Sequence, residues 1–254
     1  MTLGPSSTAL AIASLIAVLP IIINAQCQNN EETSAKEKIK SLGITIFTDK
    51  GTGSVTEVLG NGNKRVSDSD LKLISNFKEI TDLSLERTQI TDAGARHLSG
   101  LKKLEWLNLY KTKIGNLGLE HLSKINSLKL LPIGTTLVTD HGLEHLRKMP
   151  QLEYLGLRGN PITDLGLIQI NVLINLKGLN LGETRITDEG IKEISKLKNL
   201  EDLWLQETSV SDDSIPELGK LRKLRSLDLR NTQFSDSGIE ELKKTLPNCT
   251  LRFE

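Results

Sequence analysis

Four histidines are the side chains in this sequence best able to bind a metal ion. His97, His121 and His145 recur every 24 residues, and His141 lies four residues before His145, one helical turn away. Two histidines one turn apart can hold Zn²⁺ when a third ligand such as His121 completes the shell. No cysteine or carboxylate is clearly placed to finish that shell. We therefore expect these histidines on surface helices without a metal.

Sequence motifs that carry catalysis are absent. The glycine pairs at 51–53 and 60–62 lack the lysine of a phosphate-binding loop, and neither G-x-S-x-G nor H-E-x-x-H occurs. Aspartates recur before each expected helix, where they serve as caps, so pairs of acids carry no catalytic signal. The sequence predicts neither an enzyme nor a cofactor.

Two cysteines remain, Cys27 and Cys249. If the chain is a stack of strands, a spacing of ~4.8 Å per strand separates its ends by roughly 40 Å, too far for a disulfide. Cys249 is expected to be a small buried apolar residue. Lipidation of Cys27 is an alternative, although Asn24-Ala25-Gln26 lacks the residues that normally precede a lipidated cysteine.

The strands and helices that would hold a functional site are predicted from an internal sequence repeat. LEWLNLYKTKI (104–114), LEYLGLRGNPI (152–162) and LKGLNLGETRI (176–186) share the pattern L-x-x-L-x-L-x-x-T/N-x-I. Its first leucine falls at a spacing of 24 without insertion, at Leu104, Leu128, Leu152, Leu176, Leu200 and Leu224. Ile80 opens an earlier copy, and Leu59 with Val66 marks a degenerate one.

Each copy continues with T-D-x-G-L-x-x-L, as in 163–170. The L-x-L step alternates faces as a strand does, whereas apolar residues three apart suit a helix. Threonine and aspartate oxygens can accept the free N–H groups of a first helical turn. Each repeat therefore predicts strand, turn and helix, and neighbouring repeats must stack to bury their apolar sides.

This pattern resembles the leucine-rich repeat family, specifically its ribonuclease-inhibitor-like and cysteine-containing subtypes, and is similar to secreted planctomycete leucine-rich-repeat proteins. The resemblance covers about 56–254. It implies an α/β fold: a right-handed horseshoe solenoid with a parallel β-sheet on the concave face and helices on the convex face. Where many members carry asparagine at the turn, this chain has threonine except at Asn160. We expect threonine hydroxyls to preserve the turn ladder, with altered curvature.

The chain divides into three expected segments. Residues 1–25 read as a signal peptide, although no Lys or Arg precedes the apolar stretch. An uncleaved anchor and a cytoplasmic protein are the alternatives, and membrane contact is expected only if this segment is retained. Residues 26–55 form an N-terminal cap, with a helix over 31–42 and a strand over 43–47. Residues 56–254 form the repeats and a closing strand. The expected location is secreted, periplasmic or in the cell envelope.

The repeat phase also predicts which side chains face the concave sheet. With the leucines inward, the third, fifth and seventh positions point outward. The same phase places Val58 in the third-position row. All tryptophans and tyrosines of the chain fall in these rows, which strand preference explains in part and partner binding explains further. The expected partner-binding residues are Asp82, Trp106, Asn108, Tyr110, Tyr154, Arg158, Asn180, Trp204, Gln206, Asp228 and Arg230.

Charge narrows the class of partner. Lys and Arg total 32 and Asp and Glu total 32, so the balanced chain lacks the basic surface that nucleic acids require. We expect a monomeric, non-catalytic module that binds a protein or peptide. The alternatives are the substrate-recognition subunit of a ubiquitin-ligase complex, for which no F-box fits before residue 56, and an envelope structural component without a discrete ligand.

Overall fold

The repeats form one continuous sheet. The computed structural model describes residues 30–253, and its ten-stranded sheet has the strands in sequence order. The first pair is antiparallel and all later pairs are parallel. The strands are β1 (Thr45–Thr48), β2 (Val55–Leu59), β3 (Asp82–Ser84), β4 (Trp106–Asn108), β5 (Leu130–Pro132), β6 (Tyr154–Gly156), β7 (Gly178–Asn180), β8 (Asp202–Trp204), β9 (Ser226–Asp228) and β10 (Thr250–Arg252).

A short helical segment follows each strand from β2 to β9. The α-helices are α2 (Asp68–Ile74), α3 (Asp92–Ala95), α4 (Asn116–Leu122), α5 (Asp140–Leu143), α6 (Asp164–Ile170), α7 (Asp188–Ile194), α8 (Ile215–Leu218) and α9 (Asp236–Thr245). Three 3₁₀ helices accompany them: η1 (Arg96–Gly100), η2 (Glu144–Lys148) and η3 (Asp212–Ser214). A further helix over 30–41 precedes β1.

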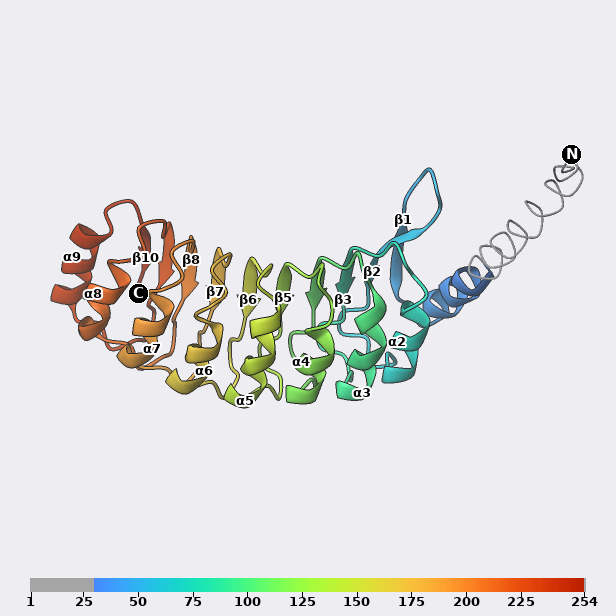
Figure 1. The fold of residues 1–254 in the computed structure, drawn as a ribbon, viewed down its shortest axis with the longest axis horizontal. Coiled ribbons are helices and arrows are strands. Elements are labelled where there is room, and N and C mark those ends of the chain that lie inside the picture. Colours follow the sequence, from blue (N-terminus) through green and yellow to red (C-terminus); the bar gives the residue numbers. More distant parts are fainter. Residues whose placement is uncertain (1–29, 254) are drawn as a thin grey trace, which may run out of the picture.

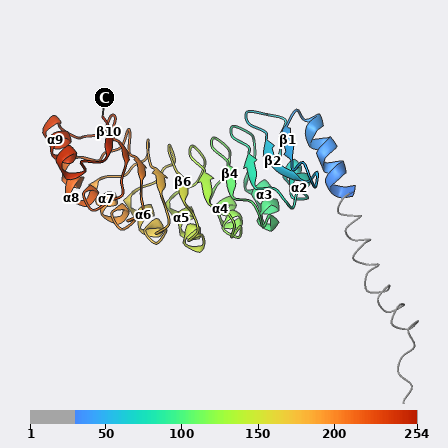
Figure 2. The same ribbon diagram turned by 90° about the horizontal axis from the view of Figure 1, so that it is seen from above.

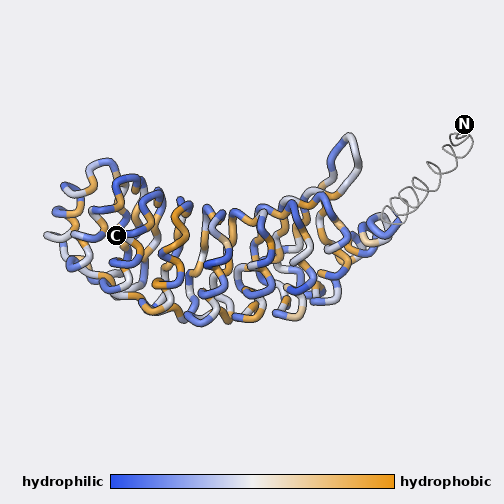
Figure 3. Tube along the Cα trace, viewed as in Figure 1, coloured by the Kyte–Doolittle hydropathy of each residue, from blue (hydrophilic) through white to orange (hydrophobic). Residues whose placement is uncertain are grey.

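The array is an open, bent solenoid. Strands line its inner side and helices its outer side, and the two ends lie far apart (Figures 1 and 2). Hydrophobic and hydrophilic segments alternate along every coil (Figure 3). The inward leucines, such as Leu107, Leu155 and Leu179, are fully buried in a core that runs the length of the array. The predicted fold class is confirmed.

The first repeat departs from the expected phase. Val58 pairs with Leu83 and is fully buried, so it faces the core and not the concave surface. Glu57 stands opposite Asp82 in its place. The spacing between these two repeats is therefore 25 residues, and extending the 24-residue phase to Val58 was wrong. The helix over 30–41 is followed by a hairpin of β1 and β2.

The helix-start aspartates join neighbouring repeats. A threonine or serine side chain caps most of the helices as expected: the Thr187 hydroxyl accepts from the Glu189 N–H. Gly115 at α4 and Thr139 at α5 make no such bond. The aspartate that follows reaches the next repeat instead. Asp164 accepts the Thr187 N–H at 2.8 Å and the Thr187 hydroxyl at 2.7 Å. The acceptors at the successive junctions are Asp68, Asp92, Asn116, Asp140, Asp164, Asp188 and Asp212.

The turn threonines behave differently from Asn160. Thr112 donates its hydroxyl to the Leu109 carbonyl at 2.7 Å, within its own repeat. Asn160 instead bonds the preceding repeat, donating to Ile133 O and accepting the Thr136 N–H. Threonine therefore closes each turn but does not extend an inter-repeat ladder, because its single hydroxyl is already used locally. The expectation of a preserved ladder holds only within each repeat.

Each turn also contains a residue with left-handed backbone. Their φ values lie between 52° and 70°, at Arg87, Lys111, Thr135, Gly159, Glu183, Glu207 and Asn231. Asparagine tolerates this conformation, whereas a β-branched side chain is strained in it. We expect Thr135→Asn to raise the free energy of unfolding by about 1 kcal/mol, measured by urea denaturation. The reverse change, Asn231→Thr, is expected to lower it, and equal stability in both variants would contradict this account.

Within the described part of the chain, no helix has the length and apolar character needed to cross a membrane. The expected signal peptide, its alternatives and Cys27 all lie outside the described residues.

Candidate functional site

The outward row predicted from the repeat phase is continuous in the structure. Trp106 on β4 pairs directly with Leu130 on β5, and Leu130 pairs with Tyr154 on β6. Leu130 is 38% exposed although it lies at the centre of the sheet. Pro132 has no N–H to donate, and the β4–β5 pairing is correspondingly reduced to one residue pair. Three large side chains on adjacent strands thus form an apolar strip on the concave face.

A second aromatic contact extends this strip toward the C-terminal end. The rings of Tyr154 and Trp204 lie edge to face with centroids 6.2 Å apart. Gly178 lies between them, and a Cβ there would stand 2.7 Å from the Tyr154 ring. The absence of a side chain on β7 therefore allows the two rings to approach. Burial raises the pKa of Tyr154, with an opposing effect from its hydrogen bond to Asn180.

Tyr110 lies beside this strip on the turn that follows β4. Its ring covers Gly134, where an added Cβ would stand 3.2 Å from a ring carbon. The Lys111 ammonium lies 5.3 Å from the Tyr110 ring centroid, within cation–π range. Asn108 accepts the Tyr110 N–H at 3.0 Å and so fixes the start of this turn. Tyr110, Tyr154 and Trp204 therefore each pack against a glycine of an adjacent repeat.

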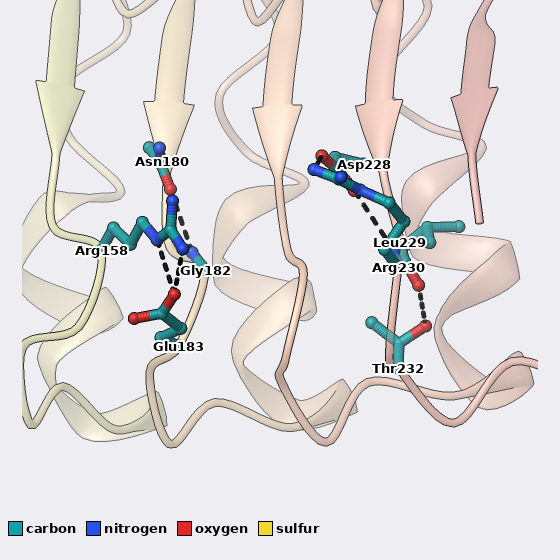
Figure 4. Close-up of polar contacts among 8 residues, drawn as sticks. All are labelled: Arg158, Asn180, Gly182, Glu183, Asp228, Leu229, Arg230 and Thr232. Carbon is teal, nitrogen blue, oxygen red and sulfur yellow. Dashed lines mark hydrogen bonds and ion pairs between the residues drawn. The ribbon is translucent and has the colours of Figure 1, made fainter. Parts of the chain in front are cut away.

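Two arginine–carboxylate pairs lie at the ends of strands on this part of the sheet (Figure 4). The Arg158 guanidinium donates to Glu183 across Gly182, with its Nε 2.8 Å from the carboxylate. Arg230 donates from Nε and Nη2 to Asp228 at 2.9 and 2.6 Å. Burial opposes ionisation of Asp228, but the hydrogen bonds from Arg230 outweigh it and hold the pKa of Asp228 below its usual value. Each of the two guanidinium groups is thus neutralised by a neighbouring carboxylate.

Gln206 is predicted as an outward residue, but it is only 6% exposed. Its amide lies against Gly182, whose missing Cβ makes the necessary room. Among the described residues, Gln206 Oε1 is the buried side-chain atom without a hydrogen-bond partner. Leaving a buried acceptor unpaired costs free energy, so this side chain is a local weak point of the structure.

The predicted set therefore separates into a central group and a periphery. The central group is Trp106, Asn108, Tyr110, Tyr154, Arg158, Asn180, Trp204 and Gln206, on or directly after β4 to β8. Asp82 lies on β3 and accepts the Thr81 hydroxyl at 2.5 Å, while Asp228 and Arg230 lie at β9. The sequence analysis missed Glu183. It is the eighth residue of the repeat that starts at Leu176, whereas only the third, fifth and seventh residues of each repeat were predicted to face outward. Its charge opposite Arg158 was the available signal.

A second polar feature lies where the strands begin. Alternating charges occupy one position of six successive repeats: Glu105, Lys129, Glu153, Lys177, Glu201 and Arg225. Lys129 bonds Glu105 at 2.9 Å, Lys177 bonds Glu153 at 2.6 Å, and Arg225 reaches Glu201 at 3.2 Å. A polar hollow of about 440 Å³ runs along this rim. These pairs are exposed and are expected to contribute little individually.

The histidines and Cys249 are not part of the concave face. Among residues 30–253, no group of three His, Cys, Asp or Glu side chains is placed to hold a metal ion. Desolvation lowers the pKa of His97 below its usual value, so this imidazole is predominantly neutral at pH 7. Cys249 is a free thiol, half-buried beside the C-terminal end of the core.

Burial raises the pKa of the Cys249 thiol to about 11, from a usual value of 9.0. The thiolate is the reactive form, so alkylation at pH 8 is expected to be roughly 100-fold slower than for an ordinary cysteine. The measurement is the rate of iodoacetamide labelling in a Cys27→Ser variant, with the same chain in urea as the reference. Equal rates in folded and unfolded chains would be incompatible with a buried thiol.

Comparison with known proteins agrees with this architecture. A family model described as Leucine Rich repeat matches residues 148–170, 172–195 and 220–243. An internalin C2 from Listeria monocytogenes is 25% identical with a TM-score of 0.63, over 78% of this chain and 80% of the other. An internalin from the same organism is 26% identical with a TM-score of 0.61, over 72% of this chain. The present chain spans 50% of that internalin.

A more distant likeness extends the fold comparison. The leucine-rich-repeat ectodomain of a plant membrane receptor kinase from Arabidopsis thaliana matches 81% of this chain at 19% identity, with a TM-score of 0.55 and 25% of its own length covered. No curated protein sequence matches. The fold and its concave surface define a solenoid repeat protein. The family match and the internalin likeness support the leucine-rich repeat family for this chain.

Proposed function

We propose that this chain is a non-catalytic binding module that captures a protein or peptide on its concave sheet. The observation that carries the proposal is the apolar strip of Trp106, Leu130 and Tyr154 on three adjacent strands, continued to Trp204. Large aromatic side chains supply much contact area while losing little conformational entropy, which is why they dominate binding hot spots.

The surroundings of the strip support a protein partner. Arg158 and Arg230 are each neutralised by a carboxylate, so the face does not favour a polyanion. The receptor-kinase ectodomain was solved in complex with Casparian strip integrity factor 2, which shows a ligand for that protein.

The location proposed for this function is outside the cytoplasm. The support is residues 1–25, whose composition is that of a signal peptide, together with the likeness to Listeria internalins. We also propose the ribonuclease-inhibitor-like subtype, on the I-T-D-x-G-L signature of the repeats. The division into a cap over 26–55 and repeats over 56–254 belongs to the same proposal.

The test is partner binding after loss of two aromatic side chains. A partner captured from cell-envelope extract or culture supernatant is titrated by calorimetry against the wild type and the Trp106→Ala/Tyr154→Ala variant. Hot-spot truncations cost about 2 kcal/mol or more each, so we expect the affinity of the double variant to fall by about 1,000-fold. Phe47→Ala is the control, because Phe47 is exposed on β1 away from the strip. Unchanged affinity in the double variant would refute the concave-face proposal.

A further inference from the structure

Positive charge is concentrated along one edge of the solenoid, although the charges of the whole chain balance. The seven residues before each strand from β3 to β10 lead from the outer helices to the inner strands (Figures 1 and 2). These eight segments hold sixteen lysines and arginines against four glutamates. We call them the basic edge: 75–81, 99–105, 123–129, 147–153, 171–177, 195–201, 219–225 and 243–249.

The opposite edge, where the chain passes from the strands to the helices, has no such excess. Its eight corresponding segments end at the first residue of each helical segment and hold eight bases and ten acids. They are 62–68, 86–92, 110–116, 134–140, 158–164, 182–188, 206–212 and 230–236. The balanced total of the chain therefore conceals an uneven distribution of charge between the two edges.

The glutamates of the basic edge are all bound, whereas many of its bases are not. Each glutamate there pairs with a base of the next repeat, as Glu105 does with Lys129 at 2.9 Å. Nine of the sixteen bases make no ion pair with a described residue, and all nine are exposed. They are Lys78, Lys102, Lys124, Arg147, Lys148, Lys198, Arg222, Lys223 and Lys244. Unpaired bases at this density favour an anionic partner.

Exposed aliphatic residues interrupt the basic edge near its middle, in segment 171–177. Val172 is 39% exposed and Ile174 is 59% exposed, and Ile168, which is 45% exposed, adjoins them on α6. The position of Val172 is a lysine in the two preceding and the three following repeats: Lys124, Lys148, Lys196, Lys220 and Lys244. A short apolar segment thus lies in the middle of a row of lysines.

We infer that the basic edge lies on an anionic lipid bilayer, with its bases at the headgroup phosphates and Val172 and Ile174 inserted between the headgroups. A soluble polyanion would bind the bases but would leave the aliphatic side chains in water. A bilayer accommodates both, because it offers phosphate charge at its surface and hydrocarbon directly beneath. A second copy of the chain would bring two basic edges together, which is unfavourable.

A hollow in the basic edge is suited to a phosphate headgroup. It has a volume of about 290 Å³ and lies between segments 99–105 and 123–129. Lys102 and Lys124 line it together with Asn126, and none of its described lining residues is acidic. Ammonium and amide groups donate hydrogen bonds to phosphate oxygens, and the bonds from a charged donor are the stronger ones. These two lysines are therefore expected to contribute strongly to the contact.

The contact also sets the orientation of the molecule. With the basic edge on the bilayer, the strands rise from the membrane, and the concave sheet stays open to the side. This consequence rests on the proposed concave-face function, whereas the membrane contact does not. The contact departs from the expectation that only a retained segment 1–25 would bring the chain to a membrane, because the repeats themselves provide it.

The test is cosedimentation of the full chain with phosphatidylcholine vesicles that contain or lack phosphatidylglycerol. We expect binding that requires phosphatidylglycerol and weakens as salt is raised. A base near an anionic surface contributes about fivefold in affinity, so Lys102→Gln/Lys124→Gln should lose about 30-fold. Lys64→Gln/Arg65→Gln is the matched control, because it removes two exposed bases from the opposite edge and should bind as the wild type does. All variants share residues 1–29, so insertion of that segment is common to them and also occurs without phosphatidylglycerol.

Replacement of an aliphatic side chain distinguishes a bilayer from a soluble polyanion. Ile174→Ser should lose about tenfold or more in vesicle affinity, since the inserted hydrocarbon is removed. Leu165→Ser is the matched control, because Leu165 is 72% exposed at the start of α6, away from the basic edge. Binding of Ile174→Ser to inorganic polyphosphate should equal that of the wild type. Trp106→Ala/Tyr154→Ala should still bind vesicles, which separates this inference from the proposed function.

Three results would overturn the inference. The first is equal binding to the two kinds of vesicle. The second is an equal loss in Lys102→Gln/Lys124→Gln and in Lys64→Gln/Arg65→Gln. The third is wild-type vesicle affinity in Ile174→Ser, and polyphosphate that displaces the vesicles in that case would identify a soluble polyanion as the occupant.

Discussion

Replacing Gly166 by alanine is expected to lower the free energy of unfolding by about 3 kcal/mol, the scale of a severe core overpacking. A Cβ at Gly166 would overlap the Asp140 carboxylate and stand 3.0 Å from a Leu143 methyl group. Asp140 cannot move away without losing its bonds to the Thr163 N–H at 2.8 Å and the Thr163 hydroxyl at 2.6 Å. Chemical denaturation with urea measures the loss.

The control for this prediction is Gly100→Ala. Gly100 has an ordinary φ, and an added Cβ there would meet no atom within 4 Å. Alanine at this position is therefore expected to leave stability unchanged or raise it slightly. A double variant, Asp140→Ala/Gly166→Ala, removes the overlap together with the bonds. Its loss should be smaller than the sum of the two single losses, and strict additivity would show that the carboxylate is not what excludes the side chain.

The motif T-D-x-G shows how far the sequence alone could lead. The position of each helix start was predictable, because threonine caps and 3.6-residue periodicity are local signals. The partner of the aspartate was not, because it lies 23 residues away in the next repeat. The glycine two residues after the aspartate is explained by the previous repeat, whose aspartate occupies the space of its side chain. Asp70 replaces this glycine in the first repeat, and Ser214 replaces it in the repeat that begins with the 3₁₀ helix η3.

The candidate site, too, was only partly predictable from the sequence. Strand phase sufficed to place Trp106, Leu130 and Tyr154 in one row, because side chains alternate across a strand. Burial within the row was not predictable, because it depends on glycines of the adjacent strand. Gln206 is buried since Gly182 leaves room for it, and Tyr154 meets Trp204 since Gly178 does. The position of a residue in the repeat therefore predicts which face of the sheet its side chain points to. How exposed that side chain is depends on the residues of the neighbouring repeats.

The aspartate ladder also predicts how the solenoid unfolds. Asp164→Ala removes both bonds to Thr187 and leaves a partly buried N–H without a partner, so we expect a loss of about 2–3 kcal/mol. In a repeat array each coil is stabilised chiefly by its neighbours, and a weakened central junction uncouples the two halves. We therefore expect Asp164→Ala to unfold in two steps where the wild type unfolds in one.

The place of an aspartate junction along the array should affect the unfolding transition more than the hydrogen bonds that the aspartate makes. Asp212 makes the same kind of bonds to Ser235, but it joins only the last helix and strand to the array. Asp212→Ala is expected to loosen the C-terminal end, with faster amide hydrogen exchange there and a single main transition elsewhere. Urea unfolding followed by circular dichroism, with hydrogen exchange on each side of α6, measures both variants. A single sharp transition for Asp164→Ala would mean that the apolar core alone couples the repeats. Two steps would show that this polar ladder contributes to holding the array together as one cooperative unit.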